Sequence, residues 1–385
     1  MKKILQVFSG NTTFSGVASY LYQQYLHADR SRIRYDFFGC KENSMALVMD
    51  DPVFADSKFF FANARTRKTG STNYFRIMRE LDRILSADDY AVVVVNTSIV
   101  AIVAACLHVV RKHPGVRLIA HAHNAGLVLP RNALRRRIAP LVGLADAAFR
   151  AYIRKHAFAL FGCSEDAIRV SFGPAAVRRK NSMVVHDAIE LPKFRFDPAV
   201  ARQVRHEAGT GESTFVLGNV GKLQKRKNQM FLLDMFSAIH STRPDSQLWL
   251  VGDGPDRPML ETRLRELDLI GAVRFLGQRS DVHRWMQGMD AFAFCTLSEG
   301  LGIVAIEAQA AGLPTIVSDG VPDDVLLSPL AKKVPLSAGP RAWAGEMLAL
   351  HAAHPSKPDV SDALRRAGYD IGAESRKVME FYENL

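Results

Sequence analysis

Short apolar runs alternate along the chain with stretches in which apolar residues recur at helical spacing. The runs lie at residues 4–8, 34–38, 91–95, 116–121 and 157–162, and again at 215–220, 247–251, 273–276, 290–295 and 315–318. Buried strands of a parallel sheet have this continuous apolar character, and helices between them provide the crossovers. The pattern predicts an α/β fold with two Rossmann-like domains, each built on a parallel sheet.

The boundary between the two domains is expected where the pattern is interrupted. Residues 193–211 are polar and read as a loop, and a second alternating set begins at residue 215. We therefore expect an N-terminal domain over residues 1–188 and a C-terminal domain over residues 189–372. A chain of 385 residues is long enough for two cores of ordinary size. The terminal stretch, residues 373–385, is predicted to be helical.

Residues 298–312 combine a strand end, a glycine-bearing loop and a helix. An apolar run ends at Thr296, a helical pattern begins near Gly302, and Gly312 is placed to end the helix. Unpaired backbone N–H groups at such a helix start attract an anion, so the stretch suits a phosphate. Glu299 and Glu307 flank this anion site and would be aimed at hydroxyl groups beside the phosphate. The alternative from geometry alone is that Glu299 caps the helix and Glu307 is solvated.

The same stretch carries a family resemblance. The sequence EGLGIVAIEA, with seven residues between Glu299 and Glu307, resembles the signature of retaining glycosyltransferases of family 4, in particular those that make bacterial capsules and exopolysaccharides. The resemblance implies the GT-B fold, in which two Rossmann-like domains face a cleft. It also implies a nucleotide-sugar donor held by the second domain, an acceptor held by the first, and a last helix that crosses back onto the first domain.

Further positions match the donor site of that family. Residues 221–228, GKLQKRKN, are similar to a segment whose two cations hold the donor diphosphate, which assigns that role to Lys222 and Lys227. Lys222 replaces the usual arginine and cannot form its bidentate fork, although Lys225 and Arg226 add charge nearby. A solvated basic loop is the alternative. Gly252 and Gly254 lie in a tight loop after the strand at 247–251 and permit a ligand to approach the backbone. The expected donor-binding residues are Gly16, Lys222, Lys227, Gly252, Gly254, Gln278, Arg279, Glu299, Gly300, Leu301, Gly302, Ile303, Val304 and Glu307.

The N-terminal domain offers a histidine at a strand end. Residues 121–124, HAHN, are similar to the family's segment in which the histidine before the Asn points at the donor sugar, so His123 is preferred over His121. The resemblance makes His123, Glu299 and Lys227 the catalytic residues. Gly16 matches a loop glycine that meets the donor phosphate, although a plain βα turn would also explain it. The chain departs from its relatives at His186 and Asp187, where they carry Asn.

The charge is unevenly distributed along the chain. The net charge is +11, and residues 1–190 hold 27 lysines and arginines against 15 acidic residues. Residues 131–155 contain seven basic residues and one acid, with apolar residues at helical spacing, and Pro140 and Gly143 are expected to break the helix. Anionic lipid is one interpretation, with Arg131, Arg135, Arg136 and Arg137 on the membrane or acceptor face. Ordinary solvated arginines are the other, and the lack of interleaved aromatic residues argues against nucleic acid.

Other sequence features limit the function. Residues 91–110 are apolar but interrupted by Asn96, Thr97 and Ser98, so they are expected to form a buried strand and a helix capped by Ser98 rather than a membrane span. The short apolar start does not resemble a secretory signal, and four isolated cysteines favour a reducing compartment. The expectation is a cytoplasmic protein, peripheral on the inner face of the membrane.

The sequence thus predicts a retaining, metal-independent hexosyltransferase. The donor is expected to be a nucleotide diphosphate sugar, UDP favoured over GDP, and the acceptor a hydroxyl of a lipid-linked saccharide in cell-surface polysaccharide biosynthesis. No cofactor is expected, because the nucleotide sugar is a co-substrate. The absence of an Asp-x-Asp pair points to lysines and helix N–H groups as the stabilisers of the leaving diphosphate. A sugar-nucleotide epimerase and a non-catalytic nucleotide-sugar-binding subunit are the alternatives.

Overall fold

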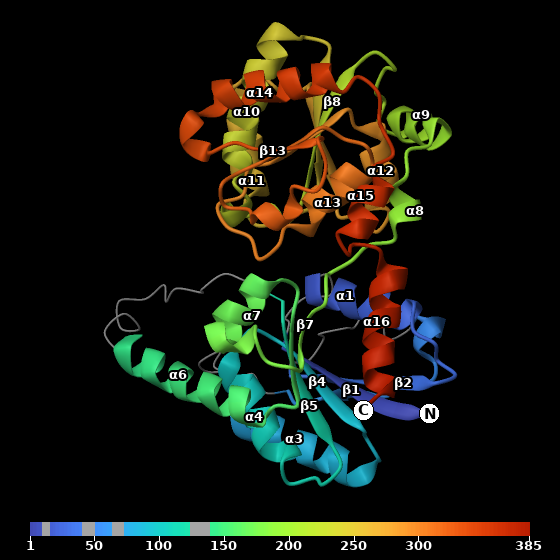
Figure 1. The fold of residues 1–385 in the computed structure, drawn as a ribbon. Coiled ribbons are helices and arrows are strands. Elements are labelled where there is room, and N and C mark those ends of the chain that lie inside the picture. Colours follow the sequence, from blue (N-terminus) through green and yellow to red (C-terminus); the bar gives the residue numbers. More distant parts are fainter. Residues whose placement is uncertain (10–15, 41–50, 64–72, 124–138) are drawn as a thin grey trace. The chain divides into compact units, whose positions relative to one another are not determined.

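A computed structural model describes residues 1–9, 16–40, 51–63, 73–123 and 139–385 (Figure 1). It divides into two compact units. Unit 1 consists of residues 1–188 together with residues 371–385, and unit 2 of residues 189–370. Each unit contains one sheet, and every strand pair in both sheets is parallel. The predicted fold class, two α/β domains with parallel sheets, is confirmed.

Unit 1 has a seven-stranded sheet in the order β3-β2-β1-β4-β5-β6-β7. Its described elements are β1 (Lys2–Phe8), α1 (Gly16–Leu26), β2 (Ile33–Gly39), η1 (Pro52–Phe54), β3 (Phe59–Phe61), α3 (Tyr74–Ala87), β4 (Val92–Asn96), α4 (Val100–Val110), β5 (Arg117–Ala122), α6 (Ala139–His156), β6 (Ala159–Gly162), α7 (Glu165–Phe172), η2 (Pro174–Ala176), β7 (Ser182–Val184) and α16 (Ile371–Glu383).

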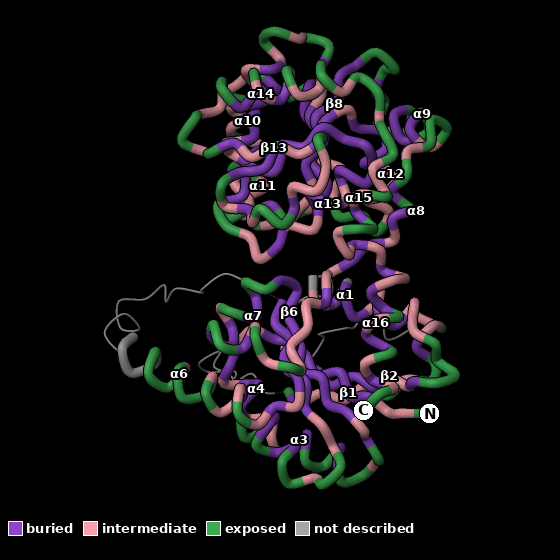
Figure 2. Tube along the Cα trace, viewed as in Figure 1, coloured by how far each residue is buried: buried purple, intermediate pink, exposed green. Residues whose placement is uncertain are grey.

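Helices cover both faces of this sheet, because successive strand residues point to opposite sides. From β1, Leu5 and Val7 enter a core with residues of α3, α4 and α7, whereas Ile4 and Phe8 enter a second core with α1 and α16. Lys2 also donates to carbonyls at and just beyond the end of α16, those of Tyr382, Glu383 and Leu385, at 2.7–3.1 Å. Figure 2 shows the central strands of the sheet buried along most of their length, and β4 is buried at all of its positions. A strand with two covered faces needs apolar residues at nearly every position, as the sequence has.

Unit 2 has a six-stranded sheet in the order β10-β9-β8-β11-β12-β13. Its elements are α8 (Leu191–Phe194), α9 (Pro198–Glu207), β8 (Phe215–Val220), η3 (Lys225–Lys227), α10 (Gln229–Thr242), β9 (Ser246–Val251), α11 (Arg257–Glu266), β10 (Val273–Gly277), α12 (Val282–Gly288), β11 (Ala291–Phe294), α13 (Ile303–Ala310), β12 (Thr315–Val317), η4 (Asp323–Val325), β13 (Ala331–Lys333), η5 (Leu336–Ala338), α14 (Pro340–Ala353) and α15 (Ser361–Arg366).

The same layering holds in unit 2. Phe292 and Phe294 of β11 pack against α8, α12 and α13, whereas Ala291 and Ala293 face the core formed with α10, α11 and α14. In each sheet the chain adds strands on one side of the first strand and then returns to add strands on its other side. The switch point of strand order therefore lies between β1 and β4 in unit 1 and between β8 and β11 in unit 2. Ligands of such sheets bind beyond the carboxyl ends of the strands at this point.

Three local predictions were wrong. Residues 193–211 contain α9, which begins with Asp197 accepting from the Ala199 N–H at 2.7 Å and Pro198 in the first turn, a start signal that the polar composition concealed. Residue 98 does not cap α4; Ile99 holds the cap position without a side-chain hydrogen bond. Finally, α6 continues through Gly143, because one interior glycine costs only about 1 kcal/mol. Pro140 lies in the first turn of α6, where a proline leaves no intrahelical bond to break, and the residues before Ala139 lie outside the described ranges, so the break expected at Pro140 stays a prediction.

Two further features bear on the setting of the chain. Within the described ranges, no helix is both long enough and apolar enough to cross a bilayer. The strand and helix expected over residues 91–110 are β4 and α4, which are largely buried in unit 1. All four cysteines are buried in the interior of their unit.

Candidate functional site

The switch point of unit 2 brings together the loops that follow β8 and β11. Leu297 donates its backbone N–H to the carbonyl of Arg226 at 2.8 Å. The Arg226 side chain in turn reaches the carbonyl of Ser298 at 2.7 Å. These two bonds join segments about 70 residues apart in sequence, and they fix the basic segment 221–228 beside the glycine-bearing loop 298–302.

Glu299 is the centre of this junction. Its Oε1 atom lies 2.8 Å from Nζ of Lys227, 2.9 Å from Nη1 of Arg226 and 2.8 Å from the Thr296 hydroxyl. Burial by itself would raise the pKa of this carboxyl, but the ammonium of Lys227 and its other donors outweigh burial and hold the pKa below its ordinary value. Among the described residues, nothing hydrogen-bonds to Oε2. Glu299 is therefore an ionised carboxylate with one occupied oxygen and one available oxygen.

Lys227 is held in place from two sides. Besides its bond to Glu299, its ammonium lies 4.6 Å from the centre of the Phe294 ring, in cation–π range. Burial lowers the pKa of Lys227, and the carboxylate of Glu299 opposes that shift. The η3 turn that carries Lys227 ends at Asn228, whose φ of 57° reverses the chain into α10. The fold thus presents Lys227 as a largely buried, paired cation at the strand ends.

The start of α13 is shaped by Gly302. Its φ of 89° is unfavourable for residues with a side chain, and an added Cβ would lie 3.2 Å from both Phe294 and Val321. Leu301 is buried just before it, and no side chain caps the first turn of the helix. The N–H groups of Ile303 and its successor therefore lack a side-chain acceptor, which is the arrangement that binds a phosphate. Glu299 precedes Gly302 and does not cap this helix.

Glu307 lies one and a half turns further along α13. It is half-buried, and burial raises the pKa of its carboxyl to about 7. In the described part of the chain, no side chain or backbone group forms a hydrogen bond or an ion pair with the Glu307 carboxyl. Burial disfavours the charged form of a carboxyl that has no partner, which lowers the stability of the fold. Glu307 is therefore a candidate for ligand contact.

The remaining donor-site predictions fall into two groups. Lys222, Gln278 and Arg279 are exposed, and the Arg279 guanidinium stacks 4.3 Å from the centre of the Trp285 ring. Gly252 and Gly254 are packed by the protein itself: an added Cβ would lie 2.2 Å from the carbonyl oxygens of Gly221 and Leu223, respectively. The two glycines therefore allow the loops after β8 and β9 to touch, a reason for glycine that sequence reasoning did not identify.

In unit 1, His123 lies directly after β5 and is buried. Its Nε2 atom lies 3.1 Å from Oδ1 of Asn96, and its Nδ1 atom lies 3.2 Å from Oδ1 of Asp187. His121 is also buried, and its ring centre is 4.1 Å from that of His123. Burial, followed by the charge of His123, holds the pKa of His121 well below its ordinary value. The neutral His121 is thus a packing partner, and His123 carries the polar contacts.

Some predicted residues cannot be placed in this way. Gly16 is the first residue of α1. Arg131, Arg135, Arg136 and Arg137 lie outside the described residues, as does Asn124. Ser164, which follows β6, caps α7: its hydroxyl accepts from the Ala167 N–H at 3.1 Å.

Sequence reasoning missed three residues of these clusters. Thr296 and Arg226 bind Glu299, and Asn96 binds His123. Each ends or follows an apolar strand, which was the available signal, because the carboxyl ends of parallel strands share one edge.

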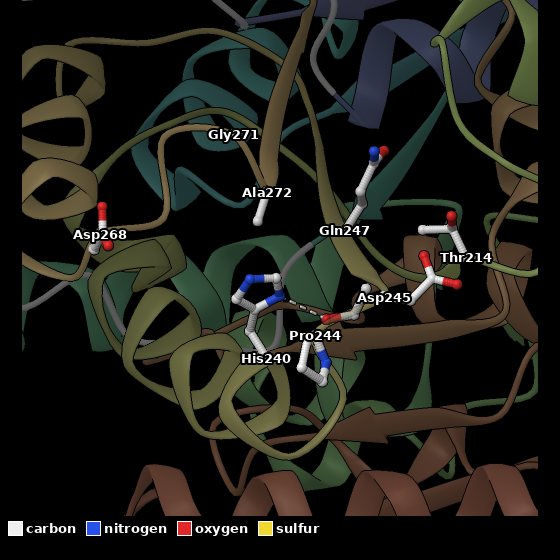
Figure 3. A pocket seen from close by; sticks show the side chains of 9 residues that line it. Thr214, His240, Pro244, Asp245, Gln247, Asp268, Gly271 and Ala272 are labelled. Carbon is white, nitrogen blue, oxygen red and sulfur yellow. Dashed lines mark hydrogen bonds between the residues drawn. The ribbon is translucent and has the colours of Figure 1, made fainter.

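A surface pocket lies at the other end of the unit 2 strands, away from the Glu299 junction (Figure 3). Its lining includes Thr214, Ser246 and Ala272, which stand at the amino ends of β8, β9 and β10. His240 reaches the Ser246 hydroxyl there at 2.9 Å. The pocket shares no residue with the Glu299 cluster, and its position at the amino ends of the strands is unlike that of ligands in such sheets.

Comparison with known proteins identifies what this architecture resembles. Residues 214–351 match the family described as Glycosyl transferases group 1. The chain is 27% identical to the protein named "Putative glycosyltransferase EpsF" of Bacillus subtilis, over 99% of this chain and 96% of that protein. It is 30% identical to the Escherichia coli UDP-Gal:alpha-D-GlcNAc-diphosphoundecaprenol alpha-1,3-galactosyltransferase over 35% of this chain and 36% of that one.

Solved structures agree with these matches. The structure of HepE of Anabaena in complex with UDP aligns with this chain over 100% of both chains, with a TM-score of 0.74 and 17% sequence identity. HepE has also been determined with UDP-glucose, at a TM-score of 0.72 and 18% identity. The resemblance to glycosyltransferases with the GT-B fold is thereby confirmed.

Proposed function

We propose that this chain is a retaining glycosyltransferase of cell-surface polysaccharide biosynthesis. It moves a hexosyl unit from a nucleotide diphosphate sugar, with UDP favoured over GDP, to a hydroxyl of a lipid-linked saccharide. The observation that carries the proposal is the junction in unit 2, where the uncapped start of α13 adjoins the Lys227–Glu299 pair. An anion-binding helix end, a fixed cation and a carboxylate with a free oxygen suit a phosphate that has a sugar attached.

Each group of the junction has a role in this proposal. The α13 N–H groups and Lys227 hold the diphosphate, and the exposed Lys222 adds charge. Glu299 accepts a hydroxyl of the donor sugar on its free Oε2, while Lys227, Arg226 and Thr296 fix the carboxylate through Oε1. Glu307, half-buried and without a protein partner among the described residues, accepts the ribose hydroxyls.

The reaction follows from these contacts. The bond between the anomeric carbon and the diphosphate oxygen breaks, and the acceptor oxygen bonds to the same face of that carbon. The acceptor's proton passes to the departing phosphate, so no protein group has to become a covalent nucleophile. Lys227 and the helix N–H groups stabilise the negative charge that develops on the diphosphate. Because the protein itself supplies this positive charge, the proposed transfer requires no metal ion.

The preference for UDP and for a lipid-linked acceptor is supported by the relatives. HepE was solved with UDP and with UDP-glucose, and the E. coli relative is named for a UDP-galactose donor and a diphosphoundecaprenol-linked acceptor. We extend both features to this chain as proposals. The two proposals are independent of each other, because the donor and the acceptor contact different groups of the protein.

A membrane-facing surface on unit 1 completes the proposal. Residues 143–149 of α6 are almost all accessible, as Figure 2 shows, and they include Leu144 at 71% exposure and Phe149 at 37%. The arginine-rich residues 131–137 immediately precede this helix in sequence. Exposed apolar side chains next to basic ones suit the headgroup region of an anionic bilayer. We therefore propose a cytoplasmic protein that binds the inner face of the membrane peripherally.

The test uses a panel of nucleotide sugars. Thermal unfolding with each UDP- and GDP-sugar should show a raised midpoint for the true donor, because a ligand that binds only the folded state stabilises it. Transfer from that donor to a polyprenyl-diphosphate saccharide is then followed by mass spectrometry, and the anomeric configuration by NMR. Release of an epimerised sugar nucleotide without an acceptor would replace the proposal with an epimerase. Binding without any turnover would indicate a non-catalytic subunit.

A further inference from the structure

The polar groups around His123 specify its protonation. Asn96 directs its Nδ2 group at Oε1 of Gln6 at 2.8 Å and at the carbonyls of Val7 and Val94, both at 3.4 Å. Three acceptors therefore fix the amide, because a flipped amide would place its oxygen against two backbone carbonyls. Consequently the Asn96 oxygen, not the nitrogen, faces Nε2 of His123, and Nε2 must carry a hydrogen to bond to it.

The other ring nitrogen faces a carboxylate. Nδ1 of His123 lies 3.2 Å from Oδ1 of Asp187, and an unprotonated nitrogen there would set two lone pairs against each other. Both nitrogens thus donate, which is the hydrogen-bond pattern of an imidazolium. The other titratable groups against this ring are His121, which burial keeps neutral, and Tyr20, whose pKa burial holds well above its ordinary value. In the described ranges, Asp187 is the carboxylate that hydrogen-bonds to His123.

The two partners differ in what they offer to a ligand. The His123 side chain is only 3% exposed and both of its nitrogens are occupied by protein atoms, whereas Asp187 is 17% exposed. No hydrogen bond from any described residue reaches Oδ2 of Asp187. A carboxylate oxygen accepts hydrogen bonds and does not donate them, so it suits a hydroxyl group.

The backbone around Asp187 is anchored. The N–H of His186 donates to Oε2 of Glu374 at 3.3 Å, and Nζ of Lys377 donates to the carbonyl of Val184 at 2.7 Å. Both partners lie on α16, the terminal helix of unit 1. Asp187 is therefore held between a helix on one side and His123 on the other.

We infer that Asp187 is the residue through which unit 1 contacts a sugar hydroxyl, and that His123 is a positioning residue that holds the Asp187 carboxylate as its ion-pair partner. The inference rests on the proposed function and specifies its site in unit 1. It revises the role that the resemblance assigns to His123. It also gives a role to Asp187, where relatives carry Asn. The ligand is a sugar hydroxyl because the free group is a lone acceptor supported by a buried cation.

The ion pair can be tested in the free protein. NMR of protein labelled with ¹⁵N-histidine distinguishes an imidazolium from either neutral tautomer at pH 7, and the His123→Gln variant identifies the His123 signals. We expect both His123 nitrogens to be protonated in the parent protein and one to lose its proton in Asp187→Asn. Asp82→Asn is the matched control, because it removes an exposed pairing with His113 in the same unit. A neutral His123 in the parent protein would overturn the ion pair.

The ligand contact is tested by kinetics with the donor found in the panel. Removing a hydrogen bond to a charged group costs about 10- to 100-fold, so Asp187→Asn should lower kcat/KM by that factor. His123→Gln should lower it less, because glutamine can still donate to Asp187, and Asp187→Glu should recover part of the loss. Binding of UDP, measured by calorimetry, should be unchanged in all three variants.

The outcomes separate the inference from the proposed function. A larger loss in His123→Gln than in Asp187→Asn would overturn the inference, because the imidazole would then be the ligand contact. Full activity in Asp187→Asn would overturn it as well. If the parent protein neither binds UDP nor transfers a sugar, the proposed function fails and the ligand contact fails with it, while the NMR result still decides the ion pair.

Discussion

The switch points of the two sheets use polar residues in opposite ways. In unit 2 the charged groups sit on loops beyond the strands, and Lys227, Arg226 and Glu299 leave a carboxylate oxygen and a helix start open to a ligand. In unit 1 the polar groups lie at the ends of the strands themselves, and Gln6, Asn96 and His123 satisfy one another in the interior. The unit 2 site, which we call the cationic cradle, consists of Lys227, Arg226 and the start of α13. The unit 1 site is a hydrogen-bonded network in the interior that leaves the Asp187 carboxylate partly exposed.

The difference follows from the charge that each region has to meet. A diphosphate carries several negative charges, which cations and N–H groups on exposed loops can surround. A sugar hydroxyl is neutral, so one well-fixed acceptor is sufficient, and fixing it is the task of the network behind it. Variants in the two units should therefore separate into those that affect nucleotide binding and those that affect transfer alone.

The largest expected effect is that of Lys227→Ala. Loss of this cation removes a charge-assisted contact to the leaving diphosphate and should reduce kcat by about 100- to 1,000-fold, with weaker binding of UDP. Steady-state kinetics and calorimetry measure the two effects. Lys222→Arg is the companion variant, and it should keep or improve activity because arginine restores the bidentate fork. Unchanged kinetics in folded Lys227→Ala would refute the cationic cradle.

The next effect concerns the basic residues that precede α6 in the sequence. Replacement of Arg135, Arg136 and Arg137 by serine should weaken binding to anionic vesicles by about 100-fold, since each arginine near the surface contributes about 1 kcal/mol. Sedimentation with vesicles measures this, and high salt should release the parent protein. Neutral vesicles are the control, and UDP binding should survive. Undiminished vesicle binding by the triple variant, or its unfolding, would mean that these arginines are solvated or structural.

Gly252→Ala should destabilise unit 2 by about 3 kcal/mol or more. The new Cβ would lie 2.2 Å from the Gly221 carbonyl oxygen at a φ of 130°, so strain and displacement of the backbone add together. Gly339→Ala is the matched control: its φ of 83° is also positive, but nothing lies within 4 Å of the new atom. Denaturant unfolding should show a cost of only about 1 kcal/mol there. Equal costs would mean that the contact between the two loops is unimportant.

Glu307→Gln should raise stability in a pH-dependent way. Because the pKa of Glu307 is raised from 4.5 to about 7 in the folded protein, the unfolded chain releases its proton first. Stability should therefore fall as the pH rises from about 4.5 to 7, by up to about 3 kcal/mol. Urea unfolding at pH 5 and pH 8 should show the variant matching the parent at the lower pH and exceeding it at the higher. UDP binding should weaken, because the proposed ribose contact is lost.

The smallest expected effect is that of a chelator. Transfer should persist in excess EDTA, because Lys227 and the start of α13 provide the positive charge that the leaving diphosphate requires. The transfer rate with and without EDTA is the measurement. Complete loss of activity that magnesium or manganese restores would show that unit 2 needs a metal as well as its cations.

Much of the fold could be predicted because apolar periodicity is local. The runs at residues 215–220 and 290–295 correspond to β8 and β11, and the helix expected from Gly302 is α13. The sequence placed Gly302 at the start of this helix, and its φ of 89° in the structure adds a backbone reason for glycine at that position. Errors arose where capping chemistry competed with composition, as at Asp197 and Pro198, or where a glycine was tolerated inside a helix, as at Gly143.

The sequence by itself determined which residue types stand at the strand ends: Lys227 and Glu299 after two strands of unit 2, and His123 after one strand of unit 1. Tertiary structure alone decided which of these atoms meet. Glu299 finds Arg226 because the loops after β8 and β11 adjoin at the switch point, and Asp187 reaches His123 across the intervening β6. These pairs lie 64 or more residues apart or depend on strand order, and no local pattern encodes which strands become neighbours or which side chains are buried together.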